Sequence, residues 1–264
     1  MAEGAFRHEY KHLINIFDAA ALRTRLGAVA KPDPNAGAKG RYRIRSLYFD
    51  NLEDKALREK LDGVNHREKF RIRFYNGNTD VIHLEKKSKH GDLCAKQAAP
   101  ISRGACEALL AGDIRPLCRS GDPLLLELYA KMRYEGLRPR TLVDYLREAY
   151  VYSPGNVRVT LDWDVRSGVR CIDLFNLSAT TLRATEGGTL LLEVKFDAFL
   201  PEVIQKAVQL DSRRAAAFSK YAACRGYGEF PRRSPRRGRG EDGFHSLIRR
   251  ELPAEAAAGA GDEA

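Results

Sequence analysis

Several short segments of this chain alternate charged and apolar residues so strictly that one face of each predicted strand is almost wholly ionic. Lys69, Arg71 and Arg73 alternate with apolar residues, and Glu193 and Lys195 follow the same rule. Successive side chains of a strand point to opposite faces, so the first of these segments places three cations on one side within about 14 Å. Like charges packed this closely repel one another. Such a surface is favourable when a polyanion lies on it.

The same ionic face recurs on at least five predicted strands. Its members are Arg7, Glu9, Lys11, Lys69, Arg71, Arg73, Glu85, Lys87, Lys96, Arg147, Arg158, Glu193 and Lys195. One interpretation is an exposed sheet face covered by water. The other is a sheet closed with this face inward, which would create a polar tunnel. The planar fork of arginine suits bidentate phosphate contacts, and a tunnel filled with phosphate and metal avoids the cost of dehydrating unpaired charges.

The few carboxylates of the ionic face have a role in such a tunnel. Mg²⁺ or Mn²⁺ is typically held by one or two carboxylates together with substrate phosphate oxygens. Glu193, with Glu9 or Glu85, could supply these ligands. Phosphoryl transfer needs positioning and charge neutralisation more than a protein nucleophile, and the pattern contains no nucleophile–base pair. The same residues would also suit a binding site without chemistry.

The elements that must position these residues form an α+β pattern, with antiparallel strands and inserted helices. Asn76-Gly77 and His90-Gly91-Asp92 indicate chain reversals, and Pro123 after Asp122 indicates a helix start. The other strands are predicted at residues 6–17, 42–49, 81–87, 94–98, 141–152, 156–165, 168–174 and 189–196. Helices are predicted after Asp18 as N-cap, around 51–61, within 100–138, and at 201–209 and 213–224.

Composition places the positive charge in the first part of the chain. The net charge is +10, and residues 229–264 carry seven arginines against seven acidic residues, so the excess belongs to residues 1–228. We expect one domain over residues 1–228 and a disordered tail over 229–264. Five scattered cysteines without metal spacing, and no apolar window of membrane-spanning length, predict a soluble cytoplasmic protein.

Six motifs together resemble the VTC domain, the polyphosphate-polymerase module of the triphosphate tunnel metalloenzyme superfamily. They are RHEYKHLI (7–14), SLYFDN (46–51), REKFRIRFY (67–75), HLEKKSK (83–89), LLEVKF (191–196) and FSKY (218–221). The resemblance covers about residues 6–227. It implies a closed, antiparallel, eight-stranded β-tunnel with a basic polar lumen and helices packed outside.

The resemblance also implies an activity and a set of site residues. The activity is ATP-dependent polyphosphate synthesis, a phosphotransferase reaction with ATP and polyphosphate as ligands and Mn²⁺ or Mg²⁺ as cofactor. The motifs assign catalytic roles to Lys11, Arg71, Arg73 and Lys220, phosphate binding to Lys87, Lys96, Arg147 and Arg158, and metal binding to Glu193.

One departure from the wider superfamily keeps alternatives open. The usual opening, E-x-E-x-K, is here Arg7-x-Glu9-x-Lys11, which removes one carboxylate and resembles the VTC branch more than the hydrolytic triphosphatases. A triphosphatase, a nucleotidyl cyclase, and a non-catalytic polyphosphate or nucleotide sensor are the alternatives. An RNA-binding module is disfavoured because the pattern shows no platform of exposed aromatic residues. A separately encoded membrane partner is compatible with the sequence.

Overall fold

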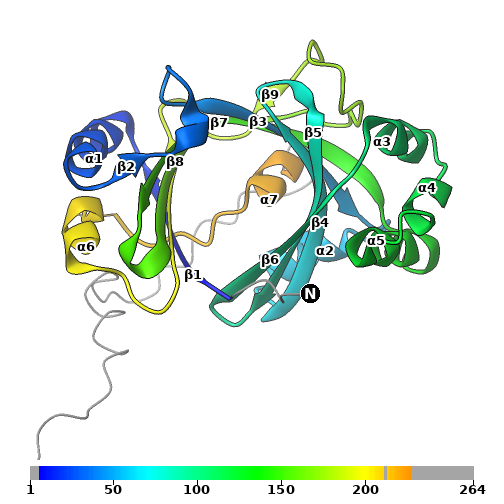
Figure 1. Ribbon diagram of the computed structural model, residues 1–264, viewed down its shortest axis with the longest axis horizontal. Helices are drawn as coiled ribbons and strands as arrows, with labels where there is room; N and C mark the ends of the chain where they lie inside the picture. The colour runs from blue at the N-terminus through cyan, green and yellow to red at the C-terminus, as the bar shows by residue number, and fades with distance from the viewer. Residues whose placement is uncertain (1–5, 211–212, 227–264) are drawn as a thin grey trace, which may run out of the picture. The chain divides into compact units, whose positions relative to one another are not determined.

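The main sheet follows one path of eight antiparallel strands, and two short strands join it at the side (Figure 1). The path runs β1-β10-β8-β7-β3-β4-β5-β6, with β2 paired to β7 and β9 to β8. The bounds are β1 His8–Ile14, β2 Lys31–Pro32, β3 Tyr42–Asp50, β4 His66–Tyr75, β5 Asn78–His90, β6 Leu93–Pro100, β7 Arg138–Tyr152, β8 Val157–Ser167, β9 Leu182–Arg183 and β10 Leu190–Phe196. This computed structural model describes residues 6–210 and 213–226.

The predicted closed, eight-stranded tunnel is wrong, because the ten-stranded sheet is not closed by a hydrogen-bond ladder. Within the described residues, its edge strands β1 and β6 meet at one isolated bridge, where Arg7 and Cys94 exchange two backbone hydrogen bonds of 3.0 Å. Further along β1, the Lys11 carbonyl accepts from the Ala216 amide at 2.8 Å, and His12 forms a bridge with Ala215. Beyond the Arg7–Cys94 bridge, the free edge of β1 therefore pairs, among the described residues, with a late segment of the chain and not with β6.

Most of the described helices cover the apolar side of the curved sheet. The helix bounds are α1 Ile16–Val29, α2 Lys55–Leu61, α3 Arg103–Leu110, α4 Arg115–Cys118, α5 Pro123–Tyr134, α6 Glu202–Val208 and α7 Lys220–Arg225. Phe70, Ile72 and Phe74 of β4 pack in one buried cluster with Leu109 of α3 and Leu128 of α5. In Figure 1, α3, α4 and α5 lie together on one side, α1 and α6 on the other, and α7 inside the curve of the sheet.

The predicted turns and the proline helix start are confirmed. β4 and β5 are joined at Asn76-Gly77, where both residues have positive φ, as a tight hairpin turn requires. β5 and β6 are joined around Gly91, also at positive φ. Pro123 is the first residue of α5, and the Asp122 side chain accepts from the backbone amides at the start of that helix.

Other predicted boundaries are wrong. Asn15, not Asp18, is the N-cap of α1, and Asp18 is its partner in a capping box. Residues 168–174 form no strand, since Val169 has a positive φ that ends β8 at Ser167. The helix predicted over 213–224 is shorter and begins at Lys220. No helix among the described residues is long and apolar enough to cross a membrane. The tail predicted over 229–264 lies outside them.

Candidate functional site

The concave side of the sheet holds a cavity of about 420 Å³, which we call the first cavity. It is lined by the ionic face that alternation predicted, while the intervening apolar residues are buried on the other side. The structure brings all nine predicted site residues to this cavity: Lys11, Arg71, Arg73, Lys87, Lys96, Arg147, Arg158, Glu193 and Lys220. Their assigned roles stay predictions.

Positive charge dominates the lining of the first cavity. Two carboxylates, Glu9 and Glu193, reach it. Eleven lysines and arginines line it: Arg7, Lys11, Lys69, Arg71, Arg73, Lys87, Lys96, Arg147, Arg158, Lys195 and Lys220. Ten of these cations form ion pairs with carboxylates in or beneath the wall. Among the described residues, Lys69 forms none. A cavity with this excess of cations favours a ligand with several negative charges.

Glu85 holds three cations in one wall of the first cavity. Its carboxylate, 3% exposed, accepts from Arg71 Nε at 2.7 Å and from Lys96 Nζ at 3.1 Å, and lies 3.6 Å from Arg73. Burial raises the pKa of Glu85, but Arg71, Arg73 and Lys96 outweigh it and lower the pKa far below its ordinary value. Glu85 therefore stays ionised and fixes these cations before any ligand arrives.

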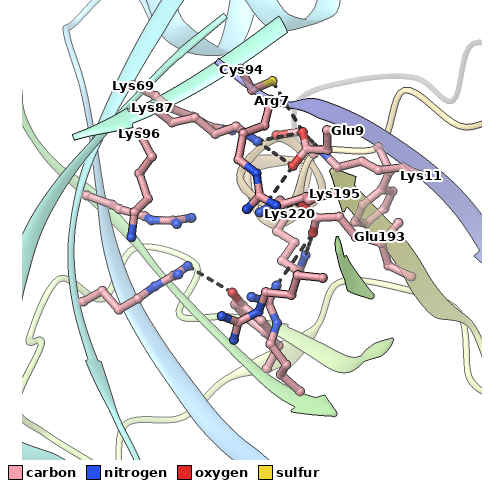
Figure 2. Close-up of a pocket in the computed structure, with 18 of the residues that line it drawn as sticks. Arg7, Glu9, Lys11, Lys69, Lys87, Cys94, Lys96, Glu193, Lys195 and Lys220 are labelled. Carbon is pink, nitrogen blue, oxygen red and sulfur yellow. Dashed lines mark hydrogen bonds and ion pairs between the residues drawn. The ribbon is translucent and has the colours of Figure 1, made fainter. Parts of the chain in front are cut away.

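Glu9 and Glu193 lie on neighbouring strands and point into the same part of the first cavity (Figure 2). Glu9 accepts from Lys11 at 2.9 Å and from Lys87 at 2.7 Å. Burial and Glu193 raise the pKa of Glu9, but the two lysines prevail and lower it to about 2. Lys195 and Lys11 likewise hold the pKa of Glu193 well below its ordinary value, against burial. Both carboxylates are therefore anionic at neutral pH.

This pair fits a divalent cation that phosphate oxygens help to bind. The described residues contain no group of three or more acidic, histidine or cysteine side chains able to hold a metal alone. Mg²⁺ and Mn²⁺ do not need such a group, since one or two carboxylates and substrate phosphates complete their coordination. Glu193 is the predicted metal ligand, and Glu9 is a second candidate ligand for the same metal ion.

Asp162 is a candidate site residue that sequence reasoning missed. This carboxylate, fully buried on β8, accepts from Arg147 at 2.6 and 2.7 Å and pairs with Lys220 at 2.6 Å. Arg147 and Lys220 each lie 3.7 Å from Glu193. Burial lowers the pKa of Lys220, but Asp162 and Glu193 prevail and raise it, so its ammonium is retained. Asp162 shares the alternation register of Arg158, and that signal could have identified it.

Three tyrosines, also missed, orient arginines of the first cavity. The Tyr48 hydroxyl accepts from Arg71 at 2.7 Å, and the Tyr145 hydroxyl accepts from Arg73 at 3.0 Å. The Tyr42 hydroxyl accepts from Arg158 at 2.8 Å, and Asp33 binds the same guanidinium. Tyr48 belongs to one of the motifs, but tyrosine hydroxyls give no periodic signal. These contacts fix the orientation of the three guanidinium groups in the wall of the first cavity.

Helix α7 completes the site from within the curve of the sheet. Lys220 is the first residue of α7, and the Ser219 side chain caps this helix by accepting from the Ala222 amide at 3.4 Å. Tyr221 and Cys224 on the same helix are buried in an apolar cluster with Tyr48 and Tyr145. This packing fixes α7 inside the curve of the sheet, and Lys220 reaches Asp162 as a result.

Several solved structures are similar to this chain at low sequence identity. A search of curated proteins found no match. Among solved structures, a Hippeastrum protein described as a suspected adenylyl cyclase with dominant triphosphatase activity is 16% identical, with a TM-score of 0.49 over 83% of this chain and 95% of that one. A protein of Pyrococcus horikoshii is 14% identical, with a TM-score of 0.46 over 81% and 96%. A suspected adenylate cyclase of Bacillus halodurans is 15% identical, with a TM-score of 0.44 over 74% and 82%.

The strongest of these findings is a match to a family model. The model is described as the VTC domain, and the match covers residues 6–227. It includes every strand of the main sheet and all nine predicted site residues. The chain therefore belongs to the VTC domain family.

Proposed function

We propose that this chain is a metal-dependent polyphosphate polymerase domain that transfers the γ-phosphate of ATP to a polyphosphate chain. The observation that carries the proposal is the first cavity, where ten cations held by carboxylates converge on one space. Phosphoryl transfer requires such positioning and neutralisation of phosphate charge, which a preorganised site supplies without reorganisation. Membership of the VTC domain family supports the same reading.

The chemistry of the proposed reaction needs no covalent enzyme intermediate. A terminal oxygen of the polyphosphate attacks the γ-phosphorus of ATP, the bond from that phosphorus to the β–γ bridging oxygen breaks, and ADP leaves. Arg71, Arg73, Lys11 and Lys220 neutralise the charge around the transferred group. The other phosphates are bound by Lys87, Lys96, Arg147 and Arg158. These cations position the reactants and stabilise the charge that develops on the bridging oxygen.

Glu193 and Glu9 would hold Mn²⁺ or Mg²⁺ in this site. When bound, such an ion neutralises phosphate charge and orients the phosphate oxygens. Arg7 supports the transferase reading over the triphosphatase one. Its guanidinium binds Asp197 at 2.8 Å and lines the first cavity at the position where the superfamily motif has a glutamate. The site is thereby left with two carboxylates for a metal.

The decisive experiment incubates the full chain with ATP and Mn²⁺ and measures both polyphosphate on a stained gel and free phosphate. A ladder of long chains with equivalent ADP is the expected result. Free phosphate without chains would establish a triphosphatase instead. Bound ATP or polyphosphate without either product would establish a sensor.

Substitution of the metal ligand tests the assignment of roles. Glu193→Gln should lower turnover at least about 100-fold, because one of two anionic metal ligands becomes neutral. Tripolyphosphate binding without metal should persist. Glu202→Gln is the matched control, since Glu202 lies on α6, outside the first cavity, and pairs with Lys206. Unchanged turnover in Glu193→Gln would contradict the metal assignment.

A further inference from the structure

A second cavity, of about 520 Å³, adjoins the first. The two share Glu9, Lys11, Lys69, Lys87, Cys94, Phe218 and Ser219 in their linings. The second cavity adds Lys60 of α2, Arg67 of β4 and Lys89 of β5, all half-buried. None of these three residues belongs to the predicted site. A ligand that fills the first cavity therefore has an adjoining basic space into which it can extend.

In the described part of the chain, the cations of the second cavity other than Lys11 and Lys87 lack the internal partners that the first cavity provides. Within the described residues, Lys60, Lys69 and Lys89 form no ion pair with a carboxylate, and Arg67 donates to the Val64 carbonyl. The carboxylates of the lining do not compensate them. Glu9 is bonded to Lys11 and Lys87, Glu68 pairs with Lys86 and Lys131 on the other side of the sheet, and Asp92 is exposed.

Strand register places like charges directly opposite one another in this region. Arg67 of β4 faces Lys89 of β5. Lys69 of β4 faces Lys87 of β5, which faces Lys96 of β6. Like charges at directly opposed positions destabilise a sheet. Burial, Lys87, Lys11 and Arg71 lower the pKa of Lys69 well below its ordinary value, as repulsion between crowded cations requires. An external anion would relieve this repulsion.

We propose that Lys60, Arg67, Lys69 and Lys89 bind phosphate units of a polyphosphate chain that extends beyond the triphosphate in the first cavity, so that affinity depends on chain length. A continuous ligand is favoured over a separate small anion because Lys69 and Lys87 line both cavities. The types of cation in the two cavities also favour a continuous chain. The first cavity is rich in arginine forks, which fix one geometry, whereas lysines contact phosphates as mobile point charges that tolerate many registers. This inference rests on the proposed function for the identity of the chain.

The test measures equilibrium binding without ATP or metal, so that its outcome is independent of turnover. Orthophosphate, tripolyphosphate and long-chain polyphosphate are titrated into the full chain and into the double variant Lys60→Ala/Lys89→Ala. The variant should lose about tenfold in affinity for the long chain, since contacts to charged groups are lost. Its affinity for tripolyphosphate should stay within about twofold, and this probe also reports that the first cavity is folded.

A matched variant removes the same charge elsewhere. Lys55→Ala/Lys206→Ala alters two exposed lysines that line neither cavity, and it should bind all three probes as the parent does. Equal losses for the long chain and tripolyphosphate in Lys60→Ala/Lys89→Ala would overturn the proposal, as would no loss. A loss confined to orthophosphate would also overturn it, in favour of a separate small-anion site. A protein that hydrolyses ATP, or does not turn over, still shows the chain-length effect, so the two proposals fail separately.

Discussion

The two cavities are built from the same kinds of side chain but differ in how their charges are compensated. In the first, Glu85, Asp162, Glu9 and Glu193 lie among the cations at ion-pair distances. In the second, the cations that do not also line the first cavity have no carboxylate partner among the described residues. Internal counter-ions fix the direction of a guanidinium or ammonium group at the expense of net charge. The first cavity is therefore suited to holding a ligand in a fixed geometry. The second is suited to attracting an anion by its net charge.

Removal of an internal counter-ion should have the largest effect on this contrast. In Glu85→Gln, Arg71, Arg73 and Lys96 lose their shared anion inside the wall. Loss of one partner of a buried ion pair costs about 3–5 kcal/mol, so we expect the free energy of unfolding to fall by this amount in urea denaturation. The corresponding change in the second cavity is Asp92→Asn. It should change stability by less than about 0.5 kcal/mol, because Asp92 is exposed. Equal effects would remove the distinction between the cavities.

Lys69 lines both cavities without an ion-pair partner among the described residues, and its removal should change stability in the opposite direction. Lys69→Met keeps the length of the side chain and removes a charge that Lys87, Lys11 and Arg71 repel. We expect the free energy of unfolding without ligand to rise by about 1 kcal/mol and polyphosphate affinity to fall, a trade of function for stability. Thermal unfolding with and without polyphosphate measures both quantities. A destabilised variant would show that Lys69 is compensated in solution.

The smallest expected effect is a pH dependence from Lys60. Burial, Arg67, Lys11 and Lys89 lower its pKa to about 8, against the attraction of Glu9. An ordinary lysine stays charged up to about pH 10, but Lys60 should lose its proton between pH 7 and 9. Affinity for long-chain polyphosphate should therefore fall about threefold more over this range in the parent than in Lys60→Ala. Parallel pH profiles would show that Lys60 makes no contact with the chain.

Much of the site could be predicted from alternation, because strand geometry alone decides which side chains share a face. Lys69, Arg71 and Arg73 lie inward for that reason, and the apolar residues between them pack against α3 and α5. Asp162 obeys the same rule, but it lies in a segment whose other residues indicate core packing. The tyrosine contacts depend on distances between strands far apart in sequence, such as Tyr145 with Arg73, and no local pattern contains them.

The open edge of the sheet could not be predicted, because it depends on which segment pairs with the free edge of β1. Ala215 and Ala216 occupy part of that edge, and their sequence has no strand pattern. Helix α7 is shorter than the predicted helix over 213–224 for a related reason. Residues before Lys220 have acceptable helix propensity, but pairing with β1 holds them extended, and tertiary context overrides propensity.

The pairing of β1 with β10 has a consequence for synthesis on the ribosome. The ion pair between Arg7 and Asp197 joins residues 190 positions apart, and His8 faces Phe196 in the sheet. β1 is synthesised before the other strands of the sheet, but its partner β10 becomes available only when nearly the whole domain has been made. Contacts of such high sequence separation form slowly. Until then a strand edge and like-charged side chains are exposed together.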